Sequence, residues 1–255
     1  PWATPQAYDN AKDFFDTGIT WSNSLNVAQM LEKSSYSISL GNTHQDGIIS
    51  STGMDRYNVK VSADTKLTSN WSSGFTANYI TTSIDKAVTS GNGLLRTVYA
   101  APPSYDLAGI PSHVDGNPYT QNSFRGSFDN AYWAMENNKF TEDTNRFFGN
   151  VYTSYQTDFG TTNHKLNAKY MVGVDAYTTH YVDSYGYGSN TGGGRGQIEN
   201  YGWTNATYNS LLTINYDWHI NEDWGLNAVV GNEIIQSNRK KYYEYGTNYN
   251  FPGWN

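Results

Sequence analysis

The residues whose side chains could perform catalysis or bind a metal are scattered along this sequence. Five histidines are present, and no two stand four residues apart, a spacing that places two zinc ligands on one face of a helix. We therefore interpret them as isolated surface residues and expect neither a metal nor a cofactor. They are His44, His113, His164, His180 and His219.

Acidic and glycine-rich motifs are similarly weak candidates for chemistry. Glu-Asp pairs at 142–143 and 222–223 fall in expected connections and are typical of solvated turns. A retaining glycosidase instead needs two carboxyl groups about 5 Å apart. The segment 192–196 is glycine-rich but lacks the Lys-Ser/Thr of a phosphate-binding loop, and Asp-Gly-Asn at 115–117 is a turn signal. We predict no catalytic residue and no enzymatic activity.

Two clusters of aromatic and amide residues are better suited to contact a ligand. Aromatic rings provide platforms and amides provide donors and acceptors, a combination that fits sugars or peptides. Both clusters fall in expected loops, where ligand contacts concentrate, although packing within a loop is the alternative for each residue. The candidate ligand-binding residues are Tyr132, Trp133, Asn137 and Asn138 in the first cluster and Tyr185, Tyr187, Tyr201 and Trp203 in the second.

The composition excludes several classes of protein. A net charge of −7 with only 16 Lys and Arg residues argues against a nucleic-acid partner. The absence of cysteine excludes disulfides and cysteine-based zinc sites. No stretch approaches 18 uncharged apolar residues, so no transmembrane helix is expected. An aromatic content of 16% argues against disorder, even though aliphatic residues are few.

The elements that must position these residues are strands. Alternation of apolar and polar side chains predicts about eight of them. A short helix is expected over Leu94–Ala100, and no long helix is expected. The expected strands cover approximately residues 20–28, 34–43, 57–63, 71–79, 145–157, 165–176, 208–218 and 225–238.

The connections between these strands alternate in length. Short gaps are expected near 29–33, 68–70, 158–163 and 219–224, and long ones at 44–55, 84–144 and 181–203. Outer-membrane barrels have short periplasmic turns and long extracellular loops. A loop as long as 84–144 is uncommon in a compact soluble domain. The pattern therefore favours an all-β, antiparallel transmembrane β-barrel segment with long extracellular loops over a soluble sandwich.

Charged residues in the expected strands share one face. A Lys or Arg that faces lipid at the midplane costs about 2–4 kcal/mol, so lipid would enforce this segregation. The opposite, apolar face has Trp71 at a short turn, and Trp218 and Trp224 flank another, as expected for a periplasmic aromatic girdle. The charged residues are Lys60, Asp64, Arg146, Lys165, Lys169, Asp175, Asp217 and Glu233.

The side chains of the polar face also indicate how large the barrel is. An eight-stranded barrel has an interior filled by its own side chains. The Asn, Ser, Thr and Gly that accompany the charges suit a wide or plugged lumen. We therefore expect the eight strands to belong to a larger barrel.

Several motifs resemble SusC/RagA-type TonB-dependent outer-membrane transporters. Together and in this order they form a fairly specific set, densest over 13–176. They are Asp-Phe-Phe-Asp-Thr-Gly at 13–18, the strand 36–43, Gln-Asp-Gly-Ile-Ile at 45–49, Thr-Gly-Met-Asp-Arg-Tyr-Asn at 52–58, Leu-Leu-Arg-Thr at 94–97, Pro-Pro-Ser-Tyr-Asp at 102–106, Asn-Pro-Tyr at 117–119, Tyr-Trp-Ala-Met-Glu-Asn-Asn at 132–138, Asn-Arg-Phe-Phe-Gly-Asn at 145–150 and Asn-Phe-Pro-Gly at 250–253.

The resemblance implies a partial barrel over the whole of residues 1–255. It would be about eight strands of a family-typical barrel of about 22, with the plug domain, the TonB box and the C-terminal strands absent. The implied function is uptake of glycan or peptide oligomers through the cell outer membrane. The implied partners are outer-membrane lipids, a SusD-like surface lipoprotein and, through the missing plug, the TonB complex.

Two alternatives remain open at this point. The first is a soluble β-rich carbohydrate-binding or adhesin module, which would share the alternation and the aromatic loops. The second is a complete small porin-like barrel. Pairing between the first and last expected strands, 20–28 and 225–238, would support that second alternative.

Overall fold

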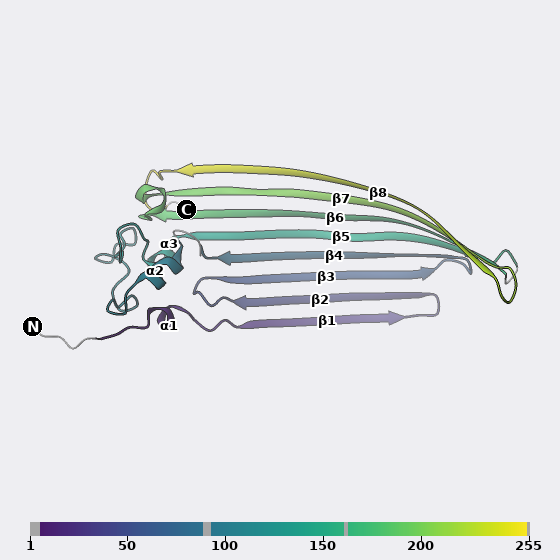
Figure 1. Ribbon diagram of the computed structural model, residues 1–255, viewed down its shortest axis with the longest axis horizontal. Coiled ribbons are helices and arrows are strands. Elements are labelled where there is room, and N and C mark those ends of the chain that lie inside the picture. Colours follow the sequence, from purple (N-terminus) through teal and green to yellow (C-terminus); the bar gives the residue numbers. More distant parts are fainter. Residues whose placement is uncertain (1–5, 89–92, 161–162, 254–255) are drawn as a thin grey trace, which may run out of the picture.

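The computed structural model describes residues 6–88, 93–160 and 163–253. One sheet of eight antiparallel strands dominates it, and each strand pairs with its neighbours in sequence (Figure 1). The all-β antiparallel class and the eight predicted strands are confirmed. The strands are β1 (Thr20–Met30), β2 (Ser34–Asp46), β3 (Gly53–Lys66), β4 (Trp71–Lys86), β5 (Lys139–Thr157), β6 (His164–Tyr187), β7 (Arg195–His219) and β8 (Gly225–Thr247).

Short helices occupy one end of this sheet. They are α1 (Asn10–Phe14), α2 (Leu94–Ala100), α3 (Ala131–Asn137) and the 3-10 turn η1 (Thr191–Gly194). The helix expected over Leu94–Ala100 is confirmed as α2, whereas α1 and α3 were not predicted. None of the helices within the described ranges is both long enough and apolar enough to cross a membrane.

The strand register sorts the side chains onto two faces. Directly paired residues share a face, and one row of such pairs runs through Leu25, Leu40, Val59, Tyr79 and Phe147. We call the face that holds this row the apolar face and the other the polar face. The register places all eight charged residues of the sequence pattern on the polar face.

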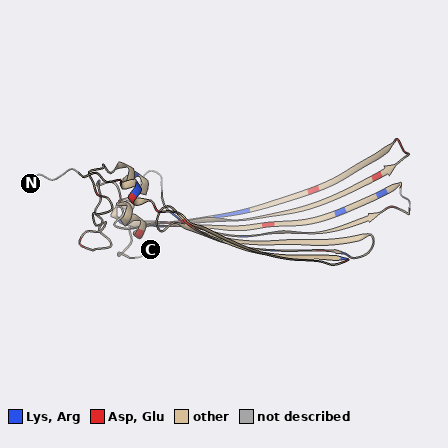
Figure 2. Cartoon of the chain, turned by 90° about the horizontal axis from the view of Figure 1, so that it is seen from below, with Lys and Arg blue, Asp and Glu red and all other residues tan. Residues whose placement is uncertain are grey.

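The two edges of the sheet are open. In the described part of the chain β1 pairs with β2 alone and β8 with β7 alone. Seen edge-on, the sheet is long and curved, and its strands do not meet in a ring (Figure 2). These eight strands therefore do not form a complete small porin-like barrel.

The predicted connections need correction. β2 and β3 are joined by residues 47–52, and β6 and β7 by 188–194, so the loops expected over 44–55 and 181–203 are mostly strand. The predicted 84–144 loop is shortened to 87–138, and its Glu142 and Asp143 lie inside β5 rather than in a turn. The short turns still gather at the opposite end from these three connections (Figure 1).

The strands are longer than predicted because the types of side chain change along them, past their last apolar residues and toward the loop cap. On β6, for instance, the rings of Tyr181 and Tyr185 lie on the polar face while the apolar face continues with Thr178 and Ser184, so the apolar/polar pattern ends although the hydrogen-bonded pairing continues. β6 and β7, for example, stay in register from His164–Trp218 up to Tyr187–Arg195.

The buried core lies beside the sheet rather than on its faces. It joins α1, α2 and α3 at the end with the long connections, through Phe14, Leu94, Val98, Trp133 and Ala134. We call this region, residues 6–18 and 93–138, the loop cap. On the apolar face, in contrast, large side chains stay exposed; Val230, for instance, is 68% exposed.

Candidate functional site

The first predicted cluster lies on and after helix α3. Asn130 begins this helix, because its side-chain oxygen accepts hydrogen bonds from the backbone N–H groups of Tyr132 (2.9 Å) and Trp133 (3.2 Å). Asn130 is itself buried. The helix therefore holds the ring of Trp133 inward at a fixed place.

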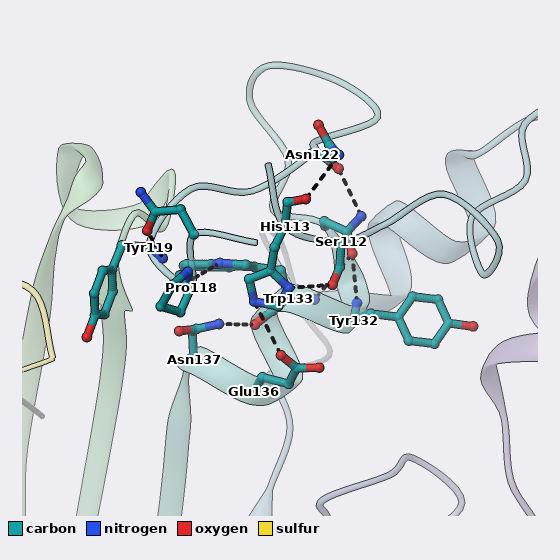
Figure 3. A network of polar contacts seen from close by, with 11 residues as sticks. Ser112, His113, Pro118, Tyr119, Asn122, Tyr132, Trp133, Glu136 and Asn137 are labelled. Carbon is teal, nitrogen blue, oxygen red and sulfur yellow. Dashed lines mark hydrogen bonds and ion pairs between the residues drawn. The ribbon is translucent and has the colours of Figure 1, made fainter. Parts of the chain in front are cut away.

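Trp133 is a core residue of the loop cap. It is 0% exposed, and its indole N–H donates to the carbonyl of Pro118 at 2.8 Å (Figure 3). The Asn137 amide donates to the Trp133 carbonyl at 3.0 Å. In this arrangement Trp133 has no exposed surface for a ligand. The residue packs within the loop, which was the alternative to ligand contact.

Tyr132 joins two parts of the loop cap, and Asn138 fastens the cap to the sheet. The Tyr132 hydroxyl donates to the carbonyl of Asp13 at 3.2 Å, which joins α3 to α1. Burial, together with the nearby charge of Asp13, raises the pKa of the Tyr132 hydroxyl. The Asn138 side-chain oxygen accepts from the backbone N–H of Gly186 on β6 at 2.8 Å. Both residues are engaged within the fold.

A buried carboxylate completes this attachment. Asp129 accepts hydrogen bonds from the Ser189 hydroxyl (2.5 Å), the Asn190 backbone N–H (2.7 Å) and the Gln121 amide (2.8 Å). It is 8% exposed, and Ser189 is 0% exposed. Asp129 therefore ties the loop cap to the turn between β6 and β7, a role that no sequence pattern indicated.

The second predicted cluster lies on strands, which corrects its placement in a loop. Tyr185 and Tyr187 are on β6, and Tyr201 and Trp203 are on β7. The register places all four on the polar face. Tyr187 contacts Tyr119 of the loop cap, with ring centroids 6.4 Å apart.

Tyr201 is the middle of a row of three tyrosines. It pairs directly with Tyr181 on β6 and Tyr243 on β8. The rings of Tyr181 and Tyr201 are stacked, with centroids 4.9 Å apart and planes 7° apart, and Tyr243 follows at 6.4 Å. We call Tyr181, Tyr201 and Tyr243 the tyrosine row.

Charged groups surround the tyrosine row on the same face. Lys86 places its ammonium 4.5 Å from the ring centroid of Tyr181 and 3.3 Å from Glu142. The Arg239 guanidinium lies 4.8 Å from the ring centroid of Trp203. These distances fit cation–π contacts, so the rings here attract cations that the chain itself supplies.

Two carboxylates lie one position further toward the loop cap. Asp183 on β6 and Glu199 on β7 are directly paired. The Tyr201 hydroxyl donates to Asp183 at 3.1 Å. Sequence reasoning missed Asp183, Glu199, Tyr181 and Tyr243. Their period-two spacing with Tyr185, Tyr201 and Tyr245 was the available signal, because it marks a continued strand.

The two predicted clusters meet at one small cavity. Asn138 of the first cluster and Tyr185 of the second both line it, together with Lys86 and Phe140. Its volume of about 20 Å³ suits a water molecule and no oligomer. The described residues include no group of His, Asp and Glu arranged to hold a metal ion.

The fold can now be compared with known proteins. No family model and no curated protein matches this sequence. Among solved structures, the RagAB peptide importer in its closed-closed state aligns with a TM-score of 0.75 at 16% identity, over 96% of this chain and 27% of that one. Its open-open state gives a TM-score of 0.74 at 15% identity.

A third structure, of the RagAB peptide transporter, aligns with a TM-score of 0.72 at 15% identity. At this identity the likeness establishes the fold. The chain spans 27–28% of the length of these transporter chains. Its sheet and loop cap therefore have the fold of a barrel segment from a transporter, and none of these neighbours is described as an enzyme.

Proposed function

We propose that this chain forms part of the barrel wall of a SusC/RagA-like, TonB-dependent importer in the cell outer membrane. The importer takes up glycan or peptide oligomers, and this chain catalyses no reaction. A plug domain outside residues 1–255 couples it to the TonB complex. The main observation in support of this proposal is the apolar face, because a band of uncharged side chains suited to contact with lipid crosses all eight strands.

The apolar face has no charge over a membrane-sized band. On β6 the band runs through Leu166, Tyr170, Val172, Val174 and Ala176. Strands rise about 3.3 Å per residue, so at a tilt of about 40° this stretch covers roughly 25 Å along the membrane normal, the usual height of the apolar band. The described residues of this band include no Asp, Glu, Lys or Arg on the apolar face of any strand.

Aromatic residues border the band near the short turns. Trp71 and Tyr155 contact each other with ring centroids 5.0 Å apart, and His164 stacks on Trp218 at 5.5 Å. Aromatic girdles occupy the two interfaces of outer-membrane barrels. The aromatic border supports our proposal that the short turns lie on the periplasmic side and the loop cap at the cell surface, where a SusD-like lipoprotein would dock.

Labelling of single cysteines on whole cells tests this topology. The chain has no cysteine, so Asp115→Cys in the loop cap and the matched Asp223→Cys in the β7–β8 turn provide defined sites in the full-length protein, with any other cysteine removed. A membrane-impermeant maleimide should label Asp115→Cys on intact cells and Asp223→Cys only after the outer membrane is permeabilised. The reverse result, or a chain that stays folded and monomeric without detergent, would contradict the proposal.

A further inference from the structure

Asp183 and Glu199 form an unusual pair on the polar face. They are directly opposite each other on β6 and β7, an arrangement in which like charges destabilise a sheet. No Lys, Arg or His within the described ranges ion-pairs with either of them. Glu142, one position along the strands, is by contrast neutralised by Lys86 at 3.3 Å.

The surroundings of this pair are aromatic and partly open. Tyr201 donates its hydroxyl to Asp183 at 3.1 Å, and Tyr243 and Tyr245 on β8 are 62% and 54% exposed. Tyr245 is directly opposite Glu199. A group that approaches the two carboxylates therefore also meets phenol rings.

The same aromatic set already binds cations of its own chain. Lys86 lies over Tyr181 and Arg239 over Trp203, at 4.5 and 4.8 Å from the ring centroids. Rings and carboxylates together form the environment in which an ammonium or guanidinium is stabilised by cation–π attraction and by charge-assisted hydrogen bonds. Lys86 occupies one such place, between Tyr181 and Glu142, and no Lys or Arg of the described residues occupies the one at Asp183 and Glu199.

A second unmet group lies on the other side of Tyr201 from the two carboxylates. The indole N–H of Trp203, two residues along β7 from Tyr201, is buried and has no hydrogen-bond acceptor among the described residues. A buried donor without a partner costs free energy, and such groups are rare. Because this N–H is buried, it is an unmet donor within the wall and is separate from the carboxylate pair.

From these observations we propose that Asp183 and Glu199, with Tyr201 and Tyr243, form a contact site for a basic side chain of an imported peptide. The inference rests on the proposed function and narrows its substrate class to peptides that carry Lys or Arg. The site lies on the polar face, beyond the uncharged band and beside the loop cap, where an incoming oligomer would meet the wall first.

Peptide binding to the full-length transporter in detergent tests the site. The probes are fluorescein-labelled Gly-Ala-Lys-Ala-Lys-Ala-Gly and its counterpart with Gln in place of both Lys. The wild type should bind the Lys peptide about tenfold more tightly or better, the gain expected from one charge-assisted hydrogen bond. The double variant Asp183→Asn/Glu199→Gln keeps the shapes of both side chains, and it should reduce the preference to within about twofold.

A matched control removes two carboxylates elsewhere on the polar face. Asp217→Asn/Glu233→Gln should retain the tenfold preference, because Asp217 lies near the short-turn end of β7 and Glu233 lies level with the middle of the uncharged band, both far along the strands from Glu199. Equal binding of the two peptides by the wild type, or a preference that survives Asp183→Asn/Glu199→Gln, would overturn the inference and leave the importer proposal standing. Failure of a correctly folded transporter to bind either peptide, together with failure to bind a glycan such as maltoheptaose, would instead contradict the proposed function.

The experiment does not depend on folding of the double variant. If that variant fails to assemble, the wild type alone decides the matter with a third probe that carries acetyl-lysine in place of Lys. Acetylation keeps the aliphatic part of the lysine side chain and removes its charge. Loss of tight binding on acetylation supports the site, and unchanged binding overturns it.

Discussion

The Ser189 hydroxyl donates to the Asp129 carboxylate at 2.5 Å across a separation of 60 residues in sequence. Asp129 belongs to the loop cap and Ser189 to the turn between β6 and β7. With the Asn190 backbone N–H at 2.7 Å, this contact attaches the cap to the tallest part of the sheet. Both of these bonds end on the same carboxylate, so one substitution removes them without a change in the sheet.

Replacing Asp129 should release the cap locally. Asp129→Ala leaves the buried Ser189 hydroxyl and the Asn190 N–H without their acceptor, at a cost of about 2–4 kcal/mol. Hydrogen exchange of amides in 188–194 and in α3 should accelerate by about 30-fold or more, while exchange within β6 and β7 stays slow. The exposed Asp115→Ala serves as the control; acceleration there of the same size would contradict the assigned role.

Removing the indole of Trp133 should unfold the cap but spare the sheet. Trp133 is 0% exposed, and truncation of a buried Trp to Ala typically costs about 3–5 kcal/mol. Limited proteolysis should cut Trp133→Ala within 93–138 much faster than the wild type. Tyr99→Ala on α2, where the side chain is 67% exposed, should leave the cleavage rate almost unchanged.

A charged residue introduced on the apolar face should lower the free energy of unfolding much more than the same residue on the polar face. Val172→Lys places a cation in the middle of the uncharged band, at an expected cost of about 2–4 kcal/mol in a bilayer. Met171→Lys is one residue away on the polar face, beside Lys169, and should cost less than about 1 kcal/mol. Equilibrium unfolding of the full-length protein in liposomes measures both; similar costs would refute the lipid-facing assignment.

The cap should loosen in alkaline solution because of Tyr132. The raised pKa of this hydroxyl means that the folded cap prefers the neutral phenol. The resulting stabilisation is complete below the unfolded pKa of about 10 and is lost as pH rises through the raised folded pKa. Tyr132→Phe should therefore flatten the increase in proteolysis of the cap between about pH 9 and pH 11. The exposed Tyr99→Phe should keep the wild-type pH profile.

The strands could be predicted wherever apolar and polar side chains alternate along the sequence. Residues 57–63 and 208–218 alternate clearly because the apolar face and the polar face differ there. Past Ala176 and before Ala206 the aromatic rings lie on the polar face and the other face carries mainly polar and small residues, so the apolar/polar pattern of the band ends and the sequence predicts Tyr185 and Tyr201 in a loop. Pairing continues there through backbone hydrogen bonds, which any side chain permits.

The candidate site was predicted in part for a related reason. The two clusters predicted from aromatic and amide content both lie at the end of the sheet beside the cap. The role of Trp133 depends on the carbonyl of Pro118, which only the folded cap brings to within 2.8 Å. The tyrosine row depends on register across β6, β7 and β8, which no single segment of sequence reveals.

The strands extend unequally beyond the uncharged band. On β2 residues 41–46 continue past Leu40, about 20 Å of strand, whereas on β7 residues 195–205 continue past Ala206, about 35 Å. The loop cap lies at the ends of the shorter strands (Figure 1). An opening bordered by this chain would therefore have one stiff side, braced by a continuous backbone ladder, and one compliant side, held by a few side chains. Any widening or narrowing of such an opening would occur on the compliant side, with the tall sheet acting as its fixed frame.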